Sequence, residues 1–114
     1  MEKTVSNEIA YEDDGTVAVI RLRGRITQAV AETLYKLIAD PPLETRQRMV
    51  LSLGGVEYLA SAGIGALVRL TGERQVKLAA PSEVVRRALG LAEVYPLFEV
   101  HASEAEAVKA FGGT

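Results

Sequence analysis

The stretch VLSLGGVEYLASAGIGALVRL, residues 50–70, decides the fold expected for this chain. Its first part belongs to a short apolar run, MVLSL (residues 49–53), which lies between charged residues and a glycine pair. Such a run is typical of a strand that is covered on both faces and is therefore central in a sheet. From Ala62 to about Glu73 the apolar residues have helical spacing, and the inner face comprises Ile64, Leu67, Val68 and Thr71. The stretch thus predicts a central strand followed by a helix.

Before this stretch, the sequence predicts a β-hairpin. Residues 4–11 and 16–22 are rich in β-branched residues and are expected to form its two strands. Asp14-Gly15 lies between them and favours a tight turn, because glycine tolerates the positive φ angle that such a turn requires. Gly24 is expected to end the second strand.

A first helix is predicted within residues 26–40, ITQAVAETLYKLIAD. Its inner face is formed by apolar residues at helical spacing, namely Val30, Leu34, Leu37 and Ile38. Thr27 is expected to cap its N-terminus, and Pro41-Pro42 is expected to stop it after Asp40. The polar residues 43–47 then predict a loop.

Beyond the second helix, the sequence predicts two further strands and two further helices. The strands are expected at QVKLAA (residues 75–80) and at YPLFEVH (residues 95–101). Ser82 is expected near the start of a helix that Gly90 ends. Ser103, with a glutamate three residues later, has the spacing of a capping box at the start of the last helix. The inner residues of that helix are expected to be Ala107, Val108 and Phe111.

Strands and helices alternate after the hairpin, which indicates βα units around a mostly parallel or mixed sheet. The expected fold class is α/β, with a mixed sheet of about four to five strands and about four helices. The sequence has no linker, no low-complexity segment and no internal repeat, so a single domain over residues 1–114 is expected.

The composition argues against several classes of function. The chain has a formal net charge of −2 and its basic residues are scattered, so no nucleic-acid partner is expected. It has no cysteine, which excludes disulfides, thiolate metal sites and cysteine nucleophiles. No apolar stretch approaches the length of a membrane span, so a cytoplasmic protein without direct membrane insertion is expected.

An enzymatic function is the weakest interpretation of the sequence. His101 is the only histidine, so a metal site would need carboxylates from distant positions. No catalytic residue, metal ligand or cofactor is therefore expected. A hydrolase that uses Ser61 with His101 is conceivable, but LASAG (residues 59–63) differs from the G-x-S-x-G pattern of a nucleophile elbow.

The glycines of the stretch do not form a nucleotide-binding loop. A phosphate-binding P-loop needs a lysine directly after its last glycine, whereas Ala66 follows Gly65. The dinucleotide fingerprint needs its glycines within one tight turn, and here an apolar segment separates Gly54-Gly55 from the others. Gly63 and Gly65 are instead expected to let the first turn of the helix lie close to a strand.

Three roles are open for Ser61, which lies at the predicted start of the second helix. As an N-cap, its oxygen would accept a backbone N–H, which is worth about 1 kcal/mol. As a phosphoacceptor, it would gain about −1.5 to −2 charges, which the N-terminus of a helix stabilises. As part of a smooth surface of small residues, from Ala60 to Gly63, it would contact another protein without any covalent change.

These residues resemble the signature of the STAS domain, the family of bacterial anti-sigma factor antagonists. The family pattern is roughly Asp-Leu-Ser-Gly-Val, two or three residues, then Asp-Ser-Ser/Ala-Gly-Leu-Gly and an apolar helix. The stretch at 50–70 is similar to this pattern. Residues 16–34 resemble the second strand and first helix of the family, and residues 89–111 resemble its C-terminal segment. The resemblance covers nearly the whole chain in the right order.

The resemblance implies a regulator of transcription that acts by partner switching. In the unphosphorylated form, such proteins bind an anti-sigma factor that is also a serine kinase, and this releases the sigma factor. Carried over to this chain, the phosphoacceptor is Ser61. The implied partner surface comprises Arg25, Ile26, Thr27, Ala60, Ser61, Ala62 and Gly63.

The chain departs from the family pattern at three positions. Ala60, Thr27 and Ser52 stand where the family commonly has aspartate, near the expected partner surface. The loss of these carboxylates should weaken charge-based recognition by the usual kinase. The alternative is a phosphorylation-independent STAS adaptor in a stress-sensing or transporter-associated complex. The sequence also leaves open a weak homodimer, since the apolar residues of VYPLF (residues 94–98) suit either a partner surface or a core.

Overall fold

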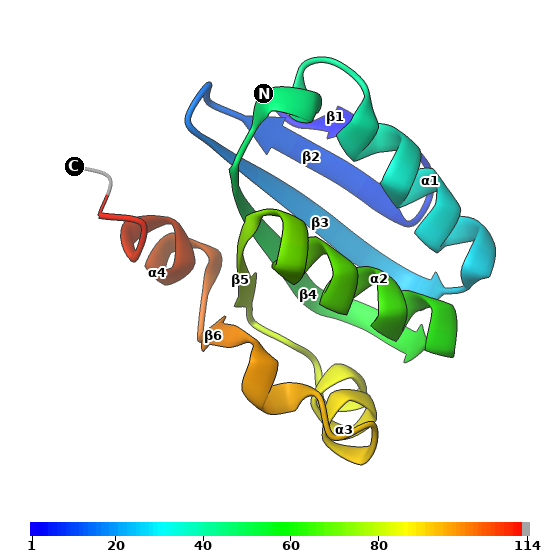
Figure 1. The fold of residues 1–114 in the computed structure, drawn as a ribbon. Coiled ribbons are helices and arrows are strands. Elements are labelled where there is room, and N and C mark those ends of the chain that lie inside the picture. Colours follow the sequence, from blue (N-terminus) through cyan, green and yellow to red (C-terminus); the bar gives the residue numbers. More distant parts are fainter. Residues whose placement is uncertain (113–114) are drawn as a thin grey trace.

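The strands form one sheet in which the order in space is the order in the chain, β1 to β6 (Figure 1). The computed structural model describes residues 1–112. β2 pairs antiparallel with both β1 and β3, whereas β3, β4, β5 and β6 pair in parallel. The strands are Lys3–Thr4, Ile9–Asp13, Val17–Ile26, Arg48–Leu59, Gln75–Ala79 and Glu99–His101. A mixed α/β sheet is confirmed, but it has six strands rather than the four to five expected.

Four α-helices connect and cover the strands in the described residues. They are α1 (Gln28–Ala39), α2 (Ser61–Glu73), α3 (Glu83–Leu91) and α4 (Glu104–Lys109). The alternation of side chains along β4 assigns the two faces: Met49, Leu51 and Leu53 pack in the main core with side chains of α1, α2 and α3. Val50 points the other way and packs with Ala107 of α4. The central strand is thus covered on both faces, as predicted.

The N-terminal hairpin differs from the prediction at two points. The expected strand over residues 4–11 is two strands, because the N–H groups of Val5 and Ser6 both donate to the Ile9 carbonyl and turn the chain back on itself. Gly24 does not end β3: it adopts a φ of +74° at a register shift, and the strand continues to Ile26. The turn at Asp14-Gly15 is confirmed.

The central strand is longer than MVLSL. β4 continues through Gly54-Gly55 to Leu59, but it pairs with β5 only as far as Ser52 and with β3 along the rest. Glycine is needed at residue 55, where a Cβ would lie 2.9 Å from the Cβ of Arg23. The sequence prediction ended the strand too early because a glycine pair normally interrupts one.

The caps and ends of the helices follow the prediction with small shifts. Thr27, Ser82 and Ser103 each accept a backbone N–H at the start of α1, α3 and α4. α1 ends at Ala39, one residue before the end expected at Asp40. α3 does not end at Gly90 but continues to Leu91.

Two segments contain short 3-10 turns that were not expected. Residues 43–47 contain a turn at Leu43–Thr45, and the predicted strand at residues 95–101 consists of a turn at Tyr95–Leu97 followed by the three residues of β6. Leu97 is exposed. No helix in residues 1–112 combines the length and the apolar character needed to span a bilayer.

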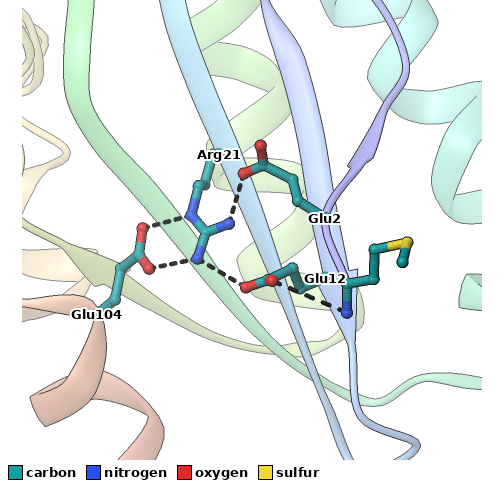
Figure 2. Close-up of polar contacts among 5 residues, drawn as sticks. Glu2, Glu12, Arg21 and Glu104 are labelled. Carbon is teal, nitrogen blue, oxygen red and sulfur yellow. Dashed lines mark hydrogen bonds and ion pairs between the residues drawn. The ribbon is translucent and has the colours of Figure 1, made fainter.

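Arg21 joins the two ends of the chain on the α4 side of the sheet (Figure 2). Its guanidinium donates two hydrogen bonds to Glu104, at 2.9 and 2.8 Å, and one each to Glu2 and Glu12, at 2.6 and 2.9 Å. These bonds, those to Glu104 above all, raise the pKa of Arg21. One side chain of β3 therefore holds α4, β2 and the N-terminal segment together.

Candidate functional site

The ends of β3 and β4 bring the two halves of the predicted partner surface together. Ile26 lies opposite Leu59 in the parallel pairing, and the N–H of Ala60 donates to the Ile26 carbonyl at 3.0 Å. The chain then turns into α1 after Thr27 and into α2 after Ala60. Residues 25–27 and 60–63 are therefore neighbours, although about thirty residues of sequence separate them.

Ser61 is not the N-cap of α2, and the prediction that it caps the helix is wrong. The cap is Ala60, which has an extended backbone and no side-chain capping bond, and whose carbonyl accepts the N–H of Ile64 at 3.0 Å. Ser61 is instead the first residue of α2. The helix begins one residue earlier than the preference of serine for the N-cap position predicts. Its side chain is exposed, and among residues 1–112 its hydroxyl has no hydrogen-bond partner.

Gly63 holds the start of α2 against the sheet. A Cβ at this position would lie 2.7 Å from Leu59 Cδ1, 3.1 Å from Ile26 Cγ2 and 3.3 Å from the Ile26 carbonyl oxygen. The close approach predicted for Gly63 is confirmed. The same prediction for Gly65 is wrong, since a Cβ there would meet nothing within 4 Å.

The seven residues of the implied surface are not equally accessible. Arg25 and Ser61 are exposed, and Thr27, Ala60 and Ala62 are half-buried. Ile26 is only 2% exposed and Gly63 is buried, so both support the surface from below rather than contact a partner. Thr27 also uses its hydroxyl to accept the N–H of Val30.

Ser52 lies far from this surface, which corrects the expectation that it is near it. It pairs with Arg21 on one side and with Ala79 on the other, in the middle of the sheet. Leu59 is seven residues further along the same strand, which corresponds to roughly 20 Å. Of the three positions that lack the family's aspartate, only Thr27 and Ala60 therefore lie beside Ser61.

Tyr58 also belongs to this region, although the sequence pattern did not predict it. Tyr58 is 42% exposed and lies opposite Arg25 in the strand pairing, and the Arg25 guanidinium lies 4.4 Å from the centre of its ring. The available signal was an aromatic residue three positions before Ser61, in a chain with only 5% aromatics. It was overlooked because this segment was not expected to be a strand.

His101 and Ser61 are not brought together. His101 pairs with Ala79 on β5, which in turn is level with Ser52 on β4. Its Nε2 lies 2.6 Å from Glu99, and the bonds of Glu99 to Lys77 and then to His101 lower the pKa of that carboxyl. Residues 1–112 contain no group of three or more His, Asp or Glu side chains arranged to hold a metal ion.

Comparison with known proteins identifies the fold. The model of the STAS domain matches residues 8–107. Among curated proteins, no sequence matches the chain. The structure is similar to the anti-sigma factor antagonist SpoIIAA in its unphosphorylated form, with a TM-score of 0.78 and 20% identity over 93% of this chain and 97% of that one.

Two other solved structures give the same result. The phosphorylated form of SpoIIAA, the Bacillus cell fate determinant, has a TM-score of 0.70 and 19% identity, over 90% of this chain and 98% of that one. An anti-sigma factor antagonist from Mycobacterium paratuberculosis has a TM-score of 0.76 and 24% identity, over 90% and 91%. With a family match over most of its length and this fold, the chain belongs to the STAS domain family.

Proposed function

We propose that this chain is a single STAS domain over residues 1–114 that acts as an anti-sigma factor antagonist. In this role it binds an anti-sigma factor with serine kinase activity, and phosphorylation of Ser61 ends the binding. The family match and the likeness to SpoIIAA in both of its forms support this role, and they also favour a regulatory binding domain over an enzyme. Such a role would place the protein in the bacterial cytoplasm, where sigma factors act.

The observation that carries the proposal is the free, exposed hydroxyl of Ser61 in the first turn of α2. A kinase needs a hydroxyl that can enter its active site, and this one has no bond within residues 1–112 to break first. The N–H groups of the first helical turn and the helix dipole stabilise a negative charge at this position. Phosphorylation is therefore expected to leave the fold unchanged and to alter only the surface.

The test is the intact mass of the protein purified from its own cells, followed by peptide mapping. A species heavier by the mass of one phosphate, present in part of the protein and located at Ser61, would support the switch. Ser61→Ala is the matched variant, since alanine also suits a first helical turn and the side chain makes no bond. Phosphate that persists in this variant, or is found at another residue, would contradict the assignment.

The second candidate is an adaptor that binds without phosphorylation. The observation in its favour is the absence of any carboxylate at residues 60 and 27, where Ala60 and Thr27 stand beside Ser61. A complete absence of phosphate at Ser61 across growth and stress conditions would favour this candidate. A weak homodimer also stays a proposal, and sedimentation of the purified chain at several concentrations would measure it.

A further inference from the structure

One aromatic ring, three residues before Ser61 in the chain, is left exposed to solvent. Tyr58, near the end of β4, is 42% exposed, whereas every other tyrosine and phenylalanine of the chain is buried or half-buried. A fold with so few aromatics would be expected to use each ring in its core. Exposed tyrosines are enriched in protein interfaces, where the ring packs on the partner and the hydroxyl stays hydrated.

Arg25 holds this ring in place. The strand pairing sets Arg25 opposite Tyr58, and the guanidinium lies over the ring at 4.4 Å from its centre. This cation–π contact restricts both side chains before any partner arrives, so less conformational entropy is lost on binding. Arginine and tyrosine are also the residue types that most often dominate the energy of an interface.

The charge of Arg25 is not neutralised by the chain itself. Arg21, Arg46 and Arg69 each have a carboxylate within ion-pair distance, but within residues 1–112 Arg25 has none. The neighbouring Ala60 and Thr27 contribute no charge. An exposed guanidinium of this kind is complemented best by a carboxylate, which can accept two hydrogen bonds from it.

We propose that Arg25 and Tyr58 form the anchor of the partner surface, and that the partner places an aspartate or glutamate side chain against Arg25. This inference rests on the proposed function and adds the chemistry of the partner. It also explains how phosphorylation would end the binding. A phosphate on Ser61 adds about −1.5 to −2 charges at the same end of β3 and β4, and these repel the partner's carboxylate.

The test uses the anti-sigma factor kinase encoded in the same genome, purified without ATP and titrated against this chain by calorimetry. Arg25→Glu and Tyr58→Ala are each expected to weaken binding at least about tenfold, as the loss of a central anchor does. Arg87→Glu is the control, because Arg87 is an exposed arginine of α3 with the same change of charge. It is expected to change the affinity less than about threefold, through the overall field alone.

A charge reversal in the partner decides whether a carboxylate is involved. Each exposed aspartate or glutamate of the kinase is changed to arginine, and one of these variants should restore binding to Arg25→Glu. If Arg25→Glu binds as well as Arg87→Glu does, or if no partner variant restores it, the inference is wrong while the proposed function stands. If the unmodified chain does not bind the kinase at all, the proposed function fails and the inference fails with it.

Discussion

Gly63 lies so close to Leu59 that a side chain at residue 63 would overlap it, with a Cβ 2.7 Å from Leu59 Cδ1. The contact fixes the start of α2 on the sheet, and with it the position of Ser61. Gly63→Ala is expected to lower the free energy of unfolding by about 1–3 kcal/mol, because Ile26 also borders the space and its backbone cannot yield. Urea denaturation would measure the change.

Gly65→Ala is the matched control for this prediction. It lies one half-turn further along the same helix, where a Cβ meets nothing within 4 Å. Alanine there is expected to raise the free energy of unfolding by about 0.5–1 kcal/mol, since it restricts the unfolded chain and favours the helix. Equal effects of the two substitutions would contradict the role given to Gly63.

Ser61 and Thr27 should differ in their importance for stability. Thr27→Ala removes the hydroxyl that accepts the Val30 N–H and is expected to lower the free energy of unfolding by about 1 kcal/mol. Ser61→Ala removes no bond and is expected to change the stability by less than about 0.5 kcal/mol. Ser61→Asp adds a charge in the first turn and is expected to stabilise the fold by about 0.3–1 kcal/mol at low salt. Thermal unfolding of the three variants in one buffer would compare them, and a large loss in Ser61→Ala would show that the hydroxyl is structural after all.

The ion pair between Arg21 and Glu104 should make stability depend on acid pH. Arg21 holds the pKa of Glu104 below its ordinary value of 4.5, so the folded state resists protonation of this carboxyl more than the unfolded state does. Its contribution is therefore complete above pH 4.5 and is lost as the pH falls through the lowered pKa of the folded state. Glu104→Gln is expected to lower the free energy of unfolding by about 1 kcal/mol at pH 7. The loss is this small because the side chains of Arg21 and Glu104 are both 32% exposed, and it becomes smaller as the pH falls.

The measurement is the free energy of unfolding as a function of pH, from neutral pH to about pH 3. Glu57→Gln serves as the control, since Glu57 is an exposed carboxylate of β4. A difference between Glu104→Gln and the unmodified chain that stays constant over the whole range would argue against the ion pair as its cause.

Arg74 should be required as arginine and not only as a positive charge. Its guanidinium donates to the carbonyls of Leu43, Arg46 and Ile38, at 3.0, 2.8 and 3.1 Å, and so ties the end of α1 to the loop before β4. A hydrogen bond from a charged group contributes about 1.5–3 kcal/mol to stability. Arg74→Lys is expected to lower the free energy of unfolding by about 1–2 kcal/mol, because one ammonium cannot reach three carbonyls in this geometry. Differential scanning calorimetry would detect the loss, and an unchanged melting temperature would refute it.

The sequence predicted the order and type of most elements because their signals are local. Helical spacing, the caps at Thr27, Ser82 and Ser103, and the turn at Asp14-Gly15 each depend on residues close in the chain. The extension of β4 through Gly54-Gly55 could not be predicted in this way. It depends on a pairing with β3 that only the folded sheet supplies.

The candidate site shows the same limit. The two segments that the resemblance implies lie side by side in the structure, but their accessibility was not predicted, because burial of Ile26 follows from the packing of α2. The cap at Ala60 rather than Ser61 depends on where the strand ends, which residue preference alone does not set. The pair formed by Arg25 and Tyr58 joins positions 33 residues apart and becomes visible only in the strand register.

The two edges of the sheet have a consequence for copies of the chain that meet in a crowded cell. The edge strands β1 and β6 contain two and three residues, and each therefore presents only about 10 Å or less of free backbone. The part of β4 beyond β5 is partly closed as well, since the N–H and the hydroxyl of Ser82 donate to the carbonyls of Leu53 and Val56. Strand addition between copies needs a longer edge, so the fold resists ordered aggregation and leaves contact between molecules to side chains.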